Sequence, residues 1–242
     1  MLSEQTAKPG APFWATEIGQ AHGTGCYQYC VDMTSFASIL LNNAIDTYFL
    51  DQFGSYLNPV PSQRQFIYEL LDEQCGQGYD FGLLDCHGNP HLGGIAFKNL
   101  LRILSDSGPS FTPANFSFGF QGGFAADKYH NGTYARLTQK SNGDWQIILQ
   151  TDQSTYDTNS GNYIGCTNYQ VQMAFGTTPT TVRVYDPMHG AGPFNVYSNV
   201  SAVALNSCQD PLIVEVSTPT VGACSQSFDL SQSCNSQYLG FM

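Results

Sequence analysis

Glu17 is the first residue whose type and position suggest chemistry. It lies near the end of a short, mostly apolar run in "APFWATEIGQAHGTG", residues 11–25, and three glycines follow it. Charged residues make up only 11% of the chain, so an acid at the tip of a strand that is predicted to be buried is unusual. Such a position raises the question of what this acid does, and Glu17 is therefore the first candidate for chemistry.

Glu69 is the candidate partner of Glu17. It lies in "QFIYELLDE", residues 65–73, a second short apolar run. Adjacent strands lie about 4.8 Å apart, so carboxyl groups on neighbouring strands can lie close together. The two glutamates can therefore cooperate if both side chains point to the same face. The alternative is that Glu69 only orients a neighbouring residue.

Other ionisable residues flank these two acids. Asp72 and Glu73 follow Glu69, and they are expected to be solvated loop acids, although acid chemistry or cation binding stays open. His22 follows Glu17 and is either a proton shuttle and substrate contact or an exposed loop residue. His87 and His91 precede a predicted helix and are expected to be structural.

Aromatic side chains are concentrated in the same part of the sequence. Tyr27 and Tyr68 are predicted to line the site, where their rings would suit sugar rings or acyl chains. Trp14 is expected to belong to the core instead.

The first half of the chain alternates predicted strands and helices. Residues 12–19 and 66–72 are predicted strands, and residues 32–52 and 93–106 have helical spacing of apolar residues. Asp32 or Thr34 can cap the first helix. This order predicts two neighbouring parallel strands joined by a helix.

The second half has the pattern of an antiparallel β-sandwich. No helical period recurs after a boundary near residues 107–113, and short alternating runs are separated by turn-like segments. These runs are "TYARLTQ", "WQIILQT", "YQVQMAF", "TVRVYD", "VSAVAL" and "PLIVEV".

Composition excludes several classes of partner. The net charge is −11 with only eight Lys plus Arg, so nucleic acid and anionic membrane surfaces are not expected partners. No apolar run approaches the length of a membrane-spanning helix. The N-terminal ten residues lack the pattern of a signal peptide, yet the polar, charge-poor composition favours an extracytoplasmic or secreted protein.

The eight cysteines favour disulfides over a metal centre. No paired C-x-x-C spacing with nearby histidines occurs, so zinc is not expected, and no metal ligands are assigned. Cys75 and Cys86 close a short glycine-rich loop and are the predicted bridge. A Cys26–Cys30 bridge requires a turn that brings their Cα atoms within about 7 Å, and buried free thiols are the alternative for the rest.

One loop of the sequence is a candidate binding site for a calcium ion. "TDQSTYDTNSGN" places Asp152, Asp157, Asn159 and Asn162 in one loop rich in oxygen ligands. The spacing is not that of an EF-hand.

Several of these segments together resemble the C-terminal part of a retaining (β/α)8-barrel glycoside hydrolase with its appended β-sandwich. "PFWATEIGQ" resembles the seventh barrel strand, "FIYELLDE" the eighth, and "YDFGLLDCHGNPHLGGIAFKNLLRILSD" the passage into the last helix. The resemblance implies a truncated (βα)2 remnant of a TIM barrel over residues 1–110, packed against a sandwich over residues 111–242. It also implies that Glu17 is the nucleophile.

The sequence departs from that family at the acid/base residue. The family's acid/base Glu follows an Asn, and this sequence contains no Asn-Glu dipeptide. Another acid such as Glu69 takes the role, another chain supplies it, or the glycosidase activity is lost.

The sequence is compatible with three functions. The first is a glycosidase-like hydrolase acting on a carbohydrate or another small substrate. The second is hydrolysis of a lactone, such as an acyl-homoserine lactone, by a carboxylate base beside Ca²⁺. The third is a non-catalytic carbohydrate-binding module.

The predicted barrel remnant also bears on assembly. Two strands and two helices cannot close a barrel, so the apolar helix residues Phe36, Leu40, Phe97, Leu100 and Leu101 are expected to lack neighbours. Exposed strand edges and apolar surface invite pairing. A homo-oligomer is therefore predicted.

Overall fold

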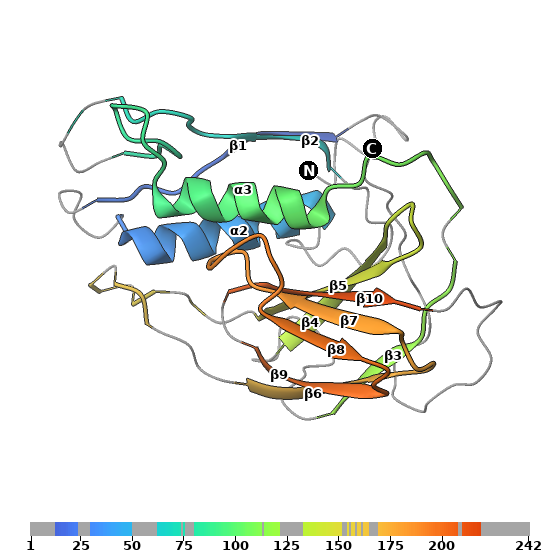
Figure 1. Cartoon of the computed structure of the whole chain (residues 1–242). Coiled ribbons are helices and arrows are strands. Elements are labelled where there is room, and N and C mark those ends of the chain that lie inside the picture. Colours follow the sequence, from blue (N-terminus) through green and yellow to red (C-terminus); the bar gives the residue numbers. More distant parts are fainter. Residues whose placement is uncertain are drawn as a thin grey trace, which may run out of the picture.

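The computed structural model describes residues 13–23, 30–49, 62–73, 75, 80–112, 114–121, 133–151, 154, 156–157, 159–160, 162–164, 169–207 and 210–218. Within these residues the fold is α+β, with mostly antiparallel sheets and two helices. Figure 1 shows four layers: a parallel strand pair, the two helices, a five-stranded sheet and a three-stranded sheet. No helix in the described part of the chain has the length and apolar character needed to cross a bilayer.

The strand pair consists of β1 (Phe13–Ile18) and β2 (Ser62–Ile67), which are parallel. Between them in the chain lies α2 (Met33–Phe49), as the predicted strand–helix–strand order requires. The second strand ends at Ile67, earlier than the predicted 66–72, because residues 68–73 turn away to pair with the segment around residues 81–84.

Asp32 fixes the start of α2. Its Oδ1 accepts hydrogen bonds from the backbone N–H groups of Thr34 and Ser35, each at 2.8 Å. Two of the otherwise unpaired N–H groups of the first turn are thereby satisfied. Asp32, rather than Thr34, is thus the capping residue.

Two sheets form the sandwich. The five-stranded sheet has the order β4-β5-β10-β7-β8, and the three-stranded sheet has the order β3-β6-β9. The strands are β3 (Phe118–Gln121), β4 (Thr133–Gln139), β5 (Trp145–Thr151), β6 (Tyr169–Phe175), β7 (Thr181–Tyr185), β8 (Asn195–Ser198), β9 (Ala202–Ser207) and β10 (Leu212–Ser217).

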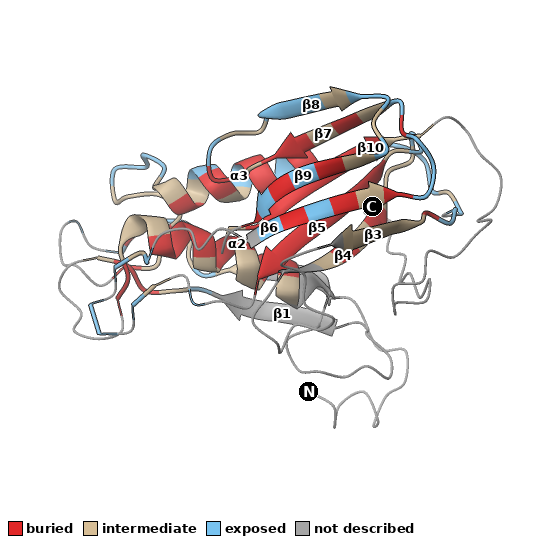
Figure 2. Ribbon diagram, turned by 90° about the horizontal axis from the view of Figure 1, so that it is seen from below, coloured by how far each residue is buried: buried red, intermediate tan, exposed pale blue. Residues whose placement is uncertain are grey.

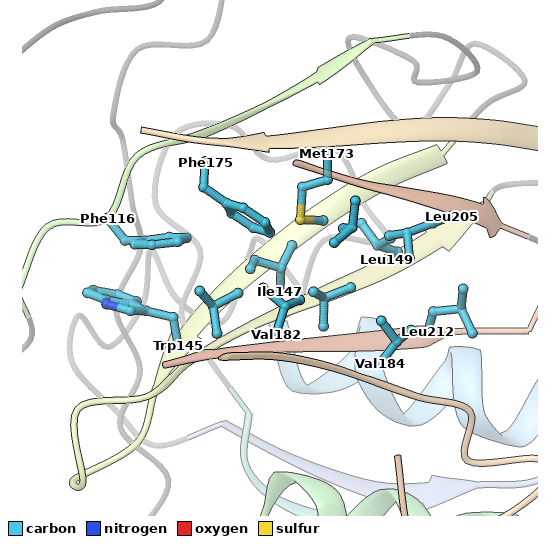
Figure 3. Close-up of a cluster of buried hydrophobic side chains, with 13 residues drawn as sticks. Phe116, Trp145, Ile147, Leu149, Met173, Phe175, Val182, Val184, Leu205 and Leu212 are labelled. Atoms are coloured by element: carbon cyan, nitrogen blue, oxygen red, sulfur yellow. The ribbon is translucent and has the colours of Figure 1, made fainter. Parts of the chain in front are cut away.

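Thirteen buried apolar side chains fill the space between the two sheets. Figure 3 shows them pointing toward one another from both sheets, with Phe116 lying over Trp145. These two rings stack with their centroids 5.3 Å apart. The alternation of apolar and polar residues in the strands places one side-chain set here, as a sandwich requires.

The helices cover the other face of the five-stranded sheet. Leu41 and Ile45 of α2 and Leu100 of α3 (Leu92–Leu104) pack with Ile148 and Ile213 of the sheet in one buried cluster. β5 is therefore buried along its whole length, whereas the edge strand β8 is largely exposed (Figure 2).

Hydrogen bonds between side chains also join the helices to the sheet. Arg136 Nη2 donates to Asp46 Oδ1 at 2.7 Å, and Gln150 Nε2 donates to Asn42 Oδ1 at 3.0 Å. These buried polar groups have partners, so their burial carries little of the usual desolvation cost.

Two predictions about the fold need correction. The expectation that the apolar helix residues lack neighbours is wrong for three of them, which are almost completely buried. Leu100 packs against the five-stranded sheet, and Phe36 and Leu40 pack on the side of the helices that faces β2. Only Leu101 of the predicted apolar set is strongly exposed. The sequence patterns also missed β3 and β8, which are four residues long and too short to show a clear alternation.

Candidate functional site

The ends of β1 and β2 place the two predicted catalytic glutamates at the same edge of the strand pair. Ile18 pairs with Ile67 in the parallel register. Glu17 lies one position before this pair, and Glu69 lies two positions after it. The carboxyl ends of adjacent parallel strands meet at one edge, which is where such folds present functional side chains. For Glu17 the structure describes the backbone position alone.

Glu69 is partly buried and held by its backbone. Its N–H donates to the carbonyl of Phe81 at 3.2 Å, and its carbonyl accepts from Leu83 N–H at 3.0 Å. Burial raises the pKa of the Glu69 carboxyl, and the negative charges of Glu73, Asp72 and Asp80 raise it further. A carboxyl group with a raised pKa keeps its proton to higher pH, as a general acid must.

The aromatic candidates are only partly described. Tyr68 is 38% exposed, and its ring packs edge-on against Phe81 with centroids 5.4 Å apart. It therefore presents ring surface beside Glu69. The peptide bond between Tyr68 and Glu69 is cis. Tyr27 lies outside the described residues, and the side chain of Trp14 is not described.

His22 is not an exposed loop residue but lies in the interior, with 2% of its surface accessible. It contacts the rings of Phe36 and His91, with centroid distances of 4.5 and 4.8 Å. A direct contact between His22 and a substrate, as predicted, would require an opening of this packing.

His22, Asp72 and His91 form the main ionisable cluster, called the His–Asp–His cluster below. The Nε2 of His91 lies 2.7 Å from Asp72 Oδ2, and the Nε2 of His22 lies 3.5 Å from Asp72 Oδ1. Asp72 is only 7% exposed, so the expectation that it is a solvated loop acid is wrong. His91 holds together the loop and α3, in line with its predicted structural role.

The backbone around Gly82 builds this cluster. Its N–H donates to Asp72 Oδ1 at 2.8 Å, and its carbonyl accepts from the Nε2–H of His22 at 3.2 Å. A Cβ atom at position 82 would lie 2.2 Å from Asp72 Oδ1. Only glycine allows the carboxylate to approach the chain so closely.

Electrostatics favour a neutral ring at His22. Burial lowers the pKa of His22, and the charge of Asp72 opposes that effect without cancelling it. Asp80, whose backbone pairs with His22 in both directions, is also buried. Among the described residues, no Lys or Arg forms an ion pair with Glu69, Asp72 or Asp80.

The predicted bridge between Cys75 and Cys86 is present, with a Cα–Cα distance of 5.3 Å. His87 Nε2 lies 3.7 Å from Cys75 Sγ, but bridged sulfurs are not thiolate ligands, so this group is not a metal site. Cys30 is also disulfide-bonded, and its partner lies outside the described residues. Glu73 is exposed, as expected.

The predicted calcium loop is described in part. Asp157 Oδ1 accepts from the backbone N–H of Asn159 at 2.9 Å, and its Oδ2 accepts from Ser160 Oγ at 3.0 Å. The carboxylate thus already closes its own turn, and these bonds lower its pKa. Asp152 lies outside the described residues.

An apolar groove of about 490 Å³ runs beside the strand ends. Leu70, Leu84, Phe97 and Leu101 contribute to its walls, together with Lys98 and Arg102 of α3. Leu70, the residue after Glu69 in the chain, is part of the groove wall, whereas Glu69 itself does not line the groove.

The sequence patterns predicted the Cys75–Cys86 disulfide, which is present, but missed the burial of Asp72 and Asp80. The sequence gives only a weak indication that these two acids are buried. Both lie next to glycine-containing or apolar segments, and neither belongs to a short motif. The members of the His–Asp–His cluster come from three distant segments, so no local spacing could connect them.

Comparison with known proteins supports the fold. Among solved structures the chain is similar to a family 39 glycoside hydrolase from the gut symbiont Bacteroides cellulosilyticus WH2, with a TM-score of 0.53 and 15% identity. The similarity covers 87% of this chain and 35% of that one, so the chain spans about a third of the hydrolase's length. At this identity the likeness concerns the fold alone. No protein-family model and no curated protein matches the chain.

Proposed function

We propose that the chain is a glycoside-hydrolase-like unit in which Glu17 is the nucleophile and Glu69 the acid/base residue. The observation that supports the proposal most is the parallel pairing of β1 with β2, because Glu17 lies near the end of β1 and Glu69 lies two residues beyond the end of β2. The fold likeness to a glycoside hydrolase supports a carbohydrate substrate. A barrel remnant formed by residues 1–110 and a separate sandwich from residue 111 belong to the same proposal.

The proposed reaction has two steps. The Glu17 carboxylate attacks the anomeric carbon and forms a glycosyl ester, while protonated Glu69 gives its proton to the departing oxygen. Glu69, now a carboxylate, takes a proton from water, which cleaves the ester and restores both groups. The raised pKa of Glu69 suits the first step, and the exposed ring of Tyr68 would contact the sugar, together with Tyr27.

The test compares two glutamate variants on aryl glycosides with good and poor leaving groups. Glu17→Gln is expected to lower kcat/KM at least ~10³-fold on both kinds of substrate, because the nucleophile is lost. Glu69→Gln is expected to lower it about 10²–10⁴-fold on poor leaving groups and far less on good ones, which depart without a proton.

Asp144→Asn, in the β4–β5 turn of the sandwich, is the matched control and should retain full activity. Equal losses for Glu69→Gln on both substrate classes would remove Glu69 from the acid role. Full activity of Glu17→Gln would overturn the whole assignment and favour a carbohydrate-binding module without catalysis.

The apolar groove favours a lactone as the second candidate substrate. An acyl chain lying along Leu70 and Leu101 would bring its lactone ring near Glu69, and a carboxylate could then act as base on water. Assays on acyl-homoserine lactones of increasing chain length, with and without a calcium chelator, test this candidate. It predicts activity that rises with chain length and falls in Leu101→Ser.

The compartment and the oligomeric state stay predictions. The disulfide Cys75–Cys86 supports an extracytoplasmic location. Self-association receives support from the exposed Leu101 and the groove around it. Light scattering across a dilution series measures it, and a mass of 26.4 kDa at every concentration would contradict it.

A further inference from the structure

We infer that the His–Asp–His cluster binds one divalent transition-metal ion of the Zn²⁺ class, with His22 Nε2, Asp72 and His91 Nε2 as ligands. One ligand atom from each residue lies within 4.8 Å of the other two. Two imidazole nitrogens and one carboxylate oxygen form a donor set that suits Zn²⁺. The ion would have a structural role, and its ligand Asp72 is one of the acids whose charge raises the pKa of Glu69.

The distances around His22 fit ligands that share an ion. Two ligands at about 2.05 Å from zinc and separated by a tetrahedral angle lie ~3.3 Å apart. His22 Nε2 lies 3.5 Å from Asp72 Oδ1 and 3.2 Å from the carbonyl oxygen of Gly82. His91 Nε2 is closer to Asp72, at 2.7 Å, and would move away slightly as the ion enters. The Gly82 carbonyl or water would occupy the fourth position.

Charge supports the same assignment. Asp72 and Asp80 are both buried, and among the described residues neither forms an ion pair with Lys or Arg. A divalent cation at Asp72 would bring positive charge to buried acids that have no Lys or Arg partner among the described residues. Burial of unpaired charge is otherwise costly.

The position of His91 at the start of α3 also supports its assignment as a metal ligand. It is the N-cap of α3, where Ser, Thr, Asp or Asn is preferred, and its side chain makes no capping hydrogen bond. Its ring points to Asp72 instead. The N-terminus of α3 therefore lacks a side-chain cap, and the imidazole at this position contacts the cluster instead.

Besides the small movement of His91, metal binding requires a change of tautomer in the two rings. Each ring now carries its proton on Nε2, because Asp72 and the Gly82 carbonyl can only accept hydrogen bonds. With the proton on Nδ1 of each ring, each Nε2 would instead offer its lone pair to the ion. The ion would then tie together the exit of β1, the exit of β2 and the start of α3.

The test uses untagged full-length protein treated with chelator, dialysed and titrated at pH 7.5 with Zn²⁺ by calorimetry and with Co²⁺ by visible absorption. One equivalent is expected to bind, with the intense d–d bands of four-coordinate Co²⁺ and a rise in Tm. His91→Gln and Asp72→Asn should weaken binding more than ~100-fold, because even the loss of an outer-shell partner costs about 10–100-fold.

His189→Gln is the matched control, since His189 is exposed and paired with Asp186 in the sandwich. It should bind Zn²⁺ as the wild type does. Circular dichroism verifies that each variant is folded. If Asp72→Asn does not fold, the result for His91→Gln decides, because the His91 side chain is 18% exposed and is the most exposed of the three ligands. Absence of stoichiometric binding in the wild type, or unchanged binding in His91→Gln, would overturn the inference and leave a purely hydrogen-bonded cluster.

Discussion

The sandwich core and the segments that follow β1 and β2 bury opposite kinds of side chain. These segments, the described residues of 19–23 and 68–91, are called the strand-exit region below. Between the two sheets, every member of the buried cluster is apolar. Beyond the ends of β1 and β2, His22, Asp72 and Asp80 are buried, while Leu70 and Leu71 are exposed. Buried ionisable groups and exposed leucines are the informative exceptions to the usual distribution. The contrast supports the proposal that the strand-exit region, rather than the sandwich, carries the function.

The two regions also differ in how their backbones are held. The sandwich strands pair in continuous antiparallel ladders. The strand-exit segments are joined by isolated bridges, such as His22 with Asp80 and Leu71 with Leu84, and by one disulfide. Irregular backbone of this kind needs specific side-chain partners, because few ladder hydrogen bonds support it.

The largest expected difference concerns apolar truncation. Ile147→Ala, in the sandwich core, is expected to lower the free energy of unfolding by about 2–5 kcal/mol, since it leaves a cavity at a site with no exposed surface. Leu101→Ala, at a residue that is 54% exposed, should change it by less than about 0.5 kcal/mol. Urea unfolding measures both. Similar losses in the two variants would show that the groove around Leu101 is covered in solution.

The disulfide tests how far the strand-exit region depends on a covalent link. The double variant Cys75→Ser/Cys86→Ser is expected to lose about 2–4 kcal/mol, because the bridge restricts the unfolded chain. Amide exchange of residues 80–91 should rise more than that of β5, which keeps its ladder and its core. Equal acceleration in both regions would mean that they unfold as one unit.

The smallest expected effect is a shift in pH dependence. Glu73 is exposed, and its negative charge helps to raise the pKa of Glu69. Glu73→Gln removes that charge and therefore lowers the pKa of Glu69. If protonated Glu69 is the general acid, the alkaline limb of kcat/KM moves to lower pH.

Asp144→Asn in the sandwich should leave the same pH profile unchanged. A carboxyl NMR titration of Glu69 provides a second readout that does not depend on turnover. An unchanged Glu69 titration in Glu73→Gln would contradict the electrostatic coupling of these two acids.

The sequence patterns predict the sandwich more completely than the candidate site. The runs at β4, β5 and β6 match the observed strands residue for residue, because alternation with period two depends only on neighbouring residues. The parallel pairing of β1 with β2 follows from the intervening helix. The environments of His22 and Asp72 do not follow from any pattern, and both were predicted to be accessible.

By itself, the sequence determined the two helices, the parallel strand pair, six of the eight sandwich strands and the Cys75–Cys86 bridge. Each depends on local spacing or on a short connection along the chain. The tertiary structure alone shows which acids are buried. It also shows that the side chains of His22, Asp72 and His91 lie close together. Their meeting depends on the close approach of Gly82 to Asp72 and on the ring of Phe36 beside His22, contacts between residues far apart in the chain. Such contacts are set by packing, and side-chain pattern along the sequence does not encode them.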